Sequence, residues 1–357
     1  MAISIYRLRK KEVESTAADD LYKLIKELSN AFGVSGYEEP VRKIIQKRIK
    51  PHVDSISIDK MGNLVCKKNG KDKDTAIILA AHMDEIGLMA REVDKYGHIY
   101  FSRVGVLSKQ VLLGQKVHII GKKKEIHGII THKKLHMGEE AEGLPEDADL
   151  YVDTGAGSYE LKKMGVGIGS YIVPERKLDI LGNSDIISGK ALDDRLGCAI
   201  LIKLAETVKN PATDVYYIFT AQEEIGMYGA KTSIWKIDAS LAIAVDISFA
   251  TDHSDSGIML GKGPVITVKD SDLIANRTLV DSLVELAKKR HIPYQLEVSD
   301  IGTTDALYLS ISKGGLPATA VGVPIRNPHS TISIADLKDV KHCIRLLKAF
   351  LSHPPLF

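Results

Sequence analysis

Apolar runs that end abruptly in polar, reactive side chains recur along the chain. The run AIILAAH, residues 76–82, is apolar at every position before its terminal histidine. Such a continuous run is typical of a strand that helices cover on both faces of a sheet. Three later runs have the same form and end in acids or lead into a loop with a histidine: DVYYIFTAQEE, LAIAVDIS and PATAVGVPIRNPHS.

Segments with helical periodicity lie between these runs. In ADDLYKLIKELSNAF, the residues Leu21, Leu24, Ile25 and Leu28 fall on one helical face. Similar spacing or capping signals predict further helices in GVSGYEEPVRKIIQKRIK, ALDDRLGCAILIKLAETVKN, RTLVDSLVELAKKRH and IADLKDVKHCIRLLKAFLSH. Alternating strands and helices predict an α/β fold with a mainly parallel mixed sheet sandwiched by helices.

Residues 88–175 follow a different pattern. Short strand candidates with glycine turns replace the long helices: GHIYFSRVG, KVHIIGKKKEIHGIIT and GVGIGSYIVPE. This pattern predicts a small all-β domain inserted into the α/β domain. We therefore expect a discontinuous catalytic domain over residues 17–87 and 176–357, an inserted domain over 88–175, and an N-terminal extension over 1–16.

Composition narrows the class of protein. The 357 residues include 48 basic and 46 acidic side chains, so the net charge of +2 favours neither nucleic acid nor an anionic membrane as a partner. The cysteines Cys66, Cys198 and Cys343 are far apart, which argues against a disulfide framework and a thiolate zinc site. No apolar run reaches membrane-spanning length. We expect a cytoplasmic protein.

The polar residues at the predicted strand ends form one candidate site. Ligands of open α/β sheets bind at the carboxyl ends of the strands. The residues at those ends are His82, Asp84, Glu223, Glu224, Asp246 and His329, and a predicted helix start adds Asp193 and Asp194. Imidazoles and carboxylates without cysteine suit zinc, cobalt or manganese.

Charge balance favours two metal ions at this site. Two divalent ions, three carboxylates and one hydroxide sum to near neutrality, which a dry cleft tolerates. One carboxylate then remains for general base chemistry. Residue types alone do not decide whether Glu223 or Glu224 has that role, and Asp194 is equally well explained as a helix cap.

Five segments, in order, resemble the signature segments of a known family: AHMDEIGLMA, GKALDDRLGCA, FTAQEEIGMYGA, AVDIS and VPIRNPHS. They are similar to those of the glutamyl, deblocking and tetrahedral (TET) aminopeptidases, which are dinuclear metallopeptidases with a zinc-peptidase-like catalytic domain. The likeness runs from about Leu21 to the end of the chain.

The resemblance implies a role for each site residue. Asp193 would bridge two metal ions. His82 and Asp246 would complete the ligands of the first ion, and Glu224 and His329 those of the second.

The remaining two acids would act without being metal ligands. The resemblance implies that Glu223 is the general base and that Asp84 orients His82. It also implies cleavage of the N-terminal residue from peptides, with access restricted to short or unfolded ones. From the donor set, we expect zinc or cobalt as the two ions, with manganese as a third candidate. The inserted domain would support a homo-oligomer, in many relatives a tetrahedral homododecamer.

Other functions stay open at this stage. A dinuclear carboxypeptidase or an N-acyl amino acid deacylase would use the same metal chemistry on a different end of the substrate. A glycoside hydrolase would use Glu223 and a second carboxylate, but it would leave His82 and His329 unexplained. A peptide-binding scaffold would need none of these groups. Asp305, in GTTDA, either binds a peptide ammonium or serves as a turn or cap residue.

Overall fold

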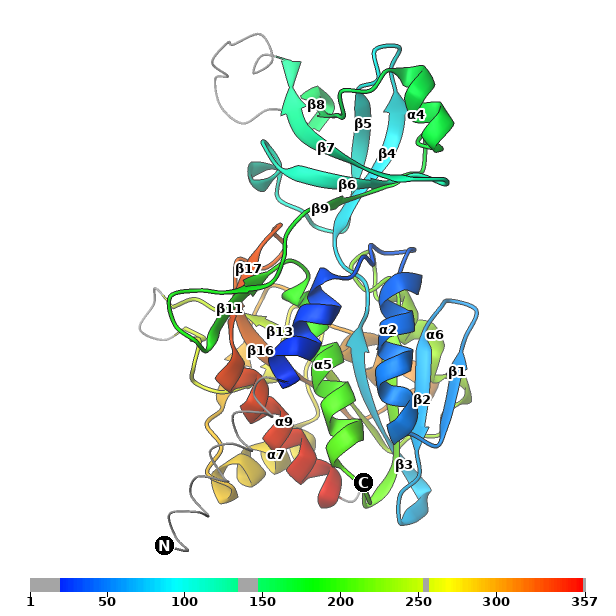
Figure 1. Ribbon diagram of the computed structural model, residues 1–357. Coiled ribbons are helices and arrows are strands. Elements are labelled where there is room, and N and C mark those ends of the chain that lie inside the picture. Colours follow the sequence, from blue (N-terminus) through cyan, green and yellow to red (C-terminus); the bar gives the residue numbers. More distant parts are fainter. Residues whose placement is uncertain (1–19, 134–146, 253–256, 356–357) are drawn as a thin grey trace, which may run out of the picture.

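The computed structural model describes residues 20–133, 147–252 and 257–355 (Figure 1). The predicted N-terminal extension, residues 1–16, lies outside these ranges. The described chain has two regions of different architecture. A layered α/β region forms the lower part of Figure 1, and a smaller β barrel lies above it.

An 11-stranded sheet forms the centre of the α/β region. Its strands are β1 (Ser55–Ile58), β2 (Leu64–Lys68), β3 (Asp72–His82), β10 (Asp179–Ile180), β11 (Ile186–Gly189), β12 (Thr213–Thr220), β13 (Leu241–Phe249), β14 (Val265–Lys269), β15 (Gln295–Val298), β16 (Ala318–Arg326) and β17 (Ser333–Asp336). They follow the order β1-β2-β12-β3-β13-β16-β17-β11-β10, with β14 beside β16 and β15 beside β14. The central strands β12, β3, β13 and β16 are parallel, and the strands that flank them, β2 and β17, are antiparallel to their neighbours. The predicted mainly parallel mixed sheet is confirmed.

Helices cover both faces of this sheet. They are the helix over residues 20–30, α2 (Glu39–Ile49), α5 (Leu192–Thr207), α6 (Tyr228–Ser233), α7 (Arg277–Lys289), α8 (Ala306–Ser310) and α9 (Leu337–Ser352). Alternate residues of β3 face opposite layers: Ile77, Leu79 and Ala81 pack in the core that contains α2, α5 and α9. Ile78 and Ala80 pack in a second core, with residues of α6 and α8. None of the helices in the described ranges combines the length and apolar character needed to cross a bilayer.

The barrel is a closed sheet with its own core. Its strands are β4 (Gly87–Val93), β5 (Ile99–Val104), β6 (Lys116–Ile120), β7 (Glu125–His132), β8 (Leu150–Asp153) and β9 (Tyr171–Pro174), and the short helix α4 (Ser158–Met164) accompanies them. Leu88, Phe101 and Ile172 are among its buried core residues. The all-β insert predicted from the glycine-rich pattern is therefore present as a barrel. The domain boundaries given above stay a prediction.

The end of β12 differs from the prediction. The strand was expected to continue to the acid pair, but it ends at Thr220, and Gln222 has a φ of +58°. Glu223 and Glu224 therefore lie in a loop beyond the sheet. The short helices α4, α6 and α8 were not predicted, because about two turns or fewer give no clear periodicity. The insert predicted as all-β therefore contains one short helix.

Candidate active site

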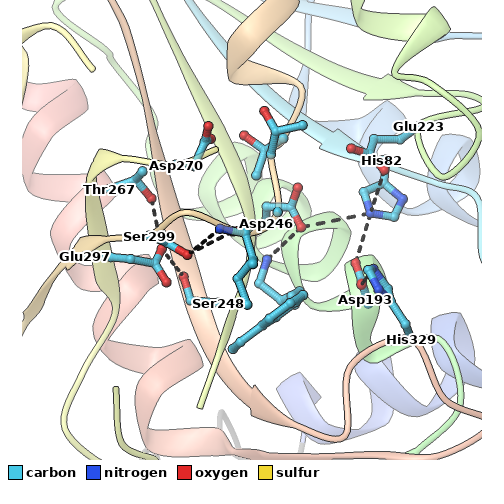
Figure 2. Close-up of a pocket in the computed structure, with 16 residues that line it drawn as sticks. His82, Asp193, Glu223, Asp246, Ser248, Thr267, Asp270, Glu297, Ser299 and His329 are labelled. Carbon is cyan, nitrogen blue, oxygen red and sulfur yellow. Dashed lines mark hydrogen bonds and ion pairs between the residues drawn. The ribbon is translucent and has the colours of Figure 1, made fainter. Parts of the chain in front are cut away.

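The predicted site residues converge at the carboxyl ends of the parallel strands. His82 is the last residue of β3, and His329 follows β16. Asp246 does not end its strand as predicted, because β13 continues to Phe249. Asp193 comes from the start of α5, and Glu223 from the loop after β12. All five line one cavity of about 570 Å³, a volume that includes its open mouth (Figure 2).

Asp193 lies between the two histidines. Its Oδ1 atom is 3.0 Å from Nε2 of His82, and its Oδ2 atom is 3.8 Å from Nε2 of His329. Two ligands of one tetrahedral zinc ion, each at about 2.1 Å, are separated by about 3.4 Å. The two oxygens of this carboxylate therefore face different imidazoles at distances close to those of shared metal ligands.

Three further acids surround the same imidazole. Oδ1 of Asp246 is 3.9 Å from Nε2 of His82, and Oε2 of Glu223 is 4.0 Å from it. Glu224 offers an oxygen within 4.8 Å of ligand atoms of His82 and Asp193. The structure thus brings together every residue that the sequence predicted as a metal ligand or general base.

Asp84 lies beneath the site, and its side chain is fully buried. Its carboxylate accepts hydrogen bonds from Oγ of Ser35 at 2.6 Å and from the backbone amides of Glu223 at 3.0 Å and Glu224 at 3.2 Å. Nδ1 of His82 is 3.5 Å from Oδ1 of Asp84 and 3.2 Å from its carbonyl oxygen. Burial acts to raise the pKa of Asp84, but the hydrogen bonds, led by that of His82, hold it below its ordinary value. One carboxylate therefore contacts both the histidine and the backbone of the acid pair.

Positive charge would stabilise the ionised form of this cluster. Burial raises the pKa of Glu223 and Glu224, and neighbouring carboxylates raise it further. Burial also raises the pKa of Asp246 to about 7. Crowded buried carboxylates stay ionised only beside cations. Imidazole nitrogens and carboxylate oxygens at this spacing fit divalent zinc, cobalt or manganese.

Asp194 lies in the first turn of α5, where its backbone is not helical, and its side chain caps the regular turn that follows. Its Oδ1 accepts a hydrogen bond from the amide of Gly197 at 2.9 Å, as a helix-capping carboxylate does. Its Oδ2 accepts one from the amide of His82 at 3.2 Å, which ties α5 to the end of β3. Asp194 also lies within ligand distance of His82 and Asp246.

Sequence reasoning missed one half of the cavity. Thr267, Asp270, Glu297 and Ser299 line it together with the predicted residues. Asp270 follows β14, and no strand was predicted over residues 265–269. Because β14 runs antiparallel to β16, the rule that aligns the carboxyl ends of parallel strands does not bring Asp270 to this site.

Asp305 is not among the residues that line the cavity. It is 2% exposed, and its Oδ2 accepts a hydrogen bond from Oγ1 of Thr220 at 2.5 Å. Burial raises its pKa to about 6. The hydrogen bond ties Asp305 to the last residue of β12, while its Oδ1 is buried and has no hydrogen-bond partner among the described residues.

A buried ion network holds the segment that carries Asp193. Glu85 accepts hydrogen bonds from Nζ of Lys190 at 2.8 and 2.7 Å, and Nη2 of Arg195 lies 3.4 Å from it. All three side chains are at most 5% exposed. Burial lowers the pKa of Lys190 to about 8 against the opposing attraction of Glu85. These contacts anchor both ends of the turn that leads into α5.

A Glu85→Gln substitution is expected to destabilise the protein by about 3–5 kcal/mol, because it leaves two buried cations without a counter-charge. Thermal or urea unfolding measures the change. Glu39→Gln is the matched control, since Glu39 forms an exposed pair with Lys43 and is expected to have no measurable effect. Equal stability of the two variants would contradict the role of the network.

The fold and this donor set define a metal-dependent peptidase, built on a helix-covered sheet with ligands at its strand ends. The sequence comparisons identify the peptidase family. The chain belongs to the M42 glutamyl aminopeptidase family, which matches residues 62–346. It is therefore a peptide-bond hydrolase, and the family predicted from the five signature segments is confirmed.

Individual relatives are similar to this chain over nearly its whole length. The lysyl aminopeptidase of Pyrococcus furiosus is 34% identical over 339 residues, which cover 92% of this chain and 96% of that protein. Aminopeptidase APDkam598 from the archaeon Desulfurococcus kamchatkensis has a TM-score of 0.89 and 35% identity, and the match covers 94% of this chain and 95% of that one. The TET1 peptidase of Pyrococcus horikoshii, which assembles into a tetrahedron or a large octahedral shell, has a TM-score of 0.86 and 30% identity, with coverage of 93% and 99%.

Proposed function

We propose that this aminopeptidase uses two divalent metal ions and a glutamate general base to remove the N-terminal residue from short peptides. The position of Asp193 carries this proposal, because its two oxygens face the two imidazoles separately. His82 and Asp246 would hold the first ion with Asp193. Glu224 and His329 would hold the second.

The residues around the proposed metal ligands have separate roles in the reaction. Bound zinc or cobalt would polarise the substrate carbonyl and lower the pKa of a water molecule. Glu223 lines the cavity, and its oxygen lies 4.0 Å from Nε2 of His82, so it is placed to accept a proton and later pass it to the leaving amine. Asp84 holds Nδ1 of His82, which leaves Nε2 to face Asp193 and Asp246.

We also propose that the chain forms a homo-oligomer of the TET type, a homododecamer, through its barrel region. Ile129, Tyr159 and Ile168 of that region are 53%, 70% and 83% exposed, which fits side chains that a neighbouring copy covers. The shell that the TET1 relative forms supports the same assembly. Light scattering that reports a monomer would contradict this part of the proposal.

Chelation is expected to abolish activity, and zinc or cobalt to restore it. The assay measures release of the N-terminal residue from free and N-acetylated peptides of every side-chain class, before and after chelation and metal addition, with manganese tested in parallel. Only free amines should be cleaved, with at least a 100-fold loss after chelation. Cleavage of acetylated substrates would favour the deacylase, and release of the C-terminal residue the carboxypeptidase. Activity that resists chelation would contradict the metal mechanism.

A further inference from the structure

The cavity has a second half away from the proposed metal ligands. Figure 2 shows Ser248, Thr267, Asp270, Glu297 and Ser299 on the side opposite His82 and Glu223. We name this half the acidic side pocket and define it by Ser248, Thr267, Asp270, Glu297, Ser299 and Thr303. Because it shares one cavity with the catalytic cluster, a substrate whose scissile bond lies at the cluster can place a side chain in it.

Asp270 has an unpaired oxygen in this pocket. The residue is 5% exposed. Its Oδ1 accepts hydrogen bonds from the amides of Asp272 at 2.9 Å and Leu273 at 2.7 Å. Its Oδ2 is buried and has no hydrogen-bond partner among the described residues. A buried carboxylate oxygen without a donor is costly, so this atom calls for a donor from a ligand.

Glu297 adds a second negative charge. Its Oε2 accepts hydrogen bonds from Oγ of Ser248 at 3.3 Å and Oγ1 of Thr267 at 3.5 Å. These hydroxyls hold the carboxylate in the pocket instead of neutralising it. Burial raises the pKa of Glu297, and the charge of Asp270 acts in the same direction, which indicates that the two acids lie near each other.

The protein supplies no cation to this pair from the cavity wall. Of the described residues that line the cavity, none is a lysine or an arginine. The neighbouring Lys269 points its Nζ elsewhere: it donates to the carbonyls of Asp270 and Ser299 at 3.0 Å each, and to Asp300 at 2.9 Å. The pocket therefore presents two carboxylates and several hydroxyls to whatever enters it.

We propose that the acidic side pocket binds the ammonium or guanidinium group of a basic N-terminal residue and makes the enzyme selective for lysyl and arginyl peptides. This rests on the proposed aminopeptidase function. A cationic donor pairs with Oδ2 of Asp270 and balances Glu297. An apolar side chain leaves Oδ2 unpaired, and an acidic side chain adds a third negative charge.

The test compares kcat/KM for substrates that differ only in the N-terminal residue: lysine, arginine, methionine, leucine and glutamate. Methionine is the neutral reference for lysine because it is also unbranched. Charged hydrogen bonds predict a preference of about 10- to 100-fold for lysine or arginine over methionine. Asp270→Asn is expected to reduce that ratio to near unity. Asn retains Oδ1 for the amides of Asp272 and Leu273, so the turn is preserved.

Asp272→Asn is the matched control. Asp272 belongs to the same turn, is exposed and does not line the cavity, so its variant should keep the wild-type preference. Glu297→Gln should lower the ratio in the same direction as Asp270→Asn. The pocket proposal alone is overturned if the wild-type enzyme cleaves methionyl, leucyl or glutamyl substrates best and Asp270→Asn does not change the ratio of kcat/KM for basic over methionyl substrates. Failure to cleave any free-amine substrate overturns both this proposal and the proposed function.

Discussion

A Glu223→Gln substitution is expected to lower kcat by about 10²- to 10⁴-fold while the bound metal stays at the wild-type level. Glutamine has the same shape but cannot accept the proton from water. The backbone amide of Glu223, which donates to Asp84 at 3.0 Å, is unchanged, so the loop keeps its position. Steady-state kinetics and elemental analysis of the purified protein measure the two quantities.

A Glu224→Gln substitution is expected to behave differently from Glu223→Gln. Glu224→Gln removes a proposed ligand, so it should lower the metal content together with the activity. Its amide also donates to Asp84, at 3.2 Å, which makes the two variants matched in their backbone contacts. If Glu223→Gln lost metal and Glu224→Gln kept it, the two residues would have exchanged roles.

An Asp193→Asn substitution is expected to lower metal affinity more than 100-fold and to abolish turnover. Substitution of a residue that only supports a metal ligand typically lowers metal affinity 10- to 100-fold, so substitution of a bridging ligand should lower it further. The amide is neutral and offers one good donor oxygen, whereas the carboxylate has one oxygen 3.0 Å from His82 and the other 3.8 Å from His329. Calorimetric titration of the metal-free protein with zinc or cobalt measures the affinity and the number of ions.

Asp185→Asn is the control for this experiment. Asp185 pairs with Lys338 at 3.0 Å, away from the cavity lining, and should bind both ions as the wild type does. Two ions bound to Asp193→Asn with unchanged affinity would remove Asp193 from the ligand set. One ion bound normally, with the other lost, would indicate that Asp193 serves a single metal.

Much of the candidate site was predictable from where the strands end. The buried runs of β3 and β13 place His82 and Asp246 at the same edge of the sheet, and the loops after β12 and β16 bring Glu223 and His329 to it. This reasoning works because parallel strands align their carboxyl ends whatever their order in the sheet. It fails for Asp270, because Asp270 follows β14, which runs antiparallel to β16, so its carboxyl end is not aligned with those of the parallel strands.

By itself, the sequence determined the class of fold and the family, and it predicted a small β insert and the residues that meet in the candidate site. Apolar runs and helical periodicity indicate which side chains are buried, and this predicts the fold class. The segments that resemble the family indicate which residues form the candidate site. Only the tertiary structure decided that Asp84 holds the amides of Glu223 and Glu224, and that Glu85 lies between Lys190 and Arg195. It also joined Asp270 and Glu297 in one pocket. These contacts join residues far apart in the chain, and they depend on strand order and loop geometry, which no local pattern encodes.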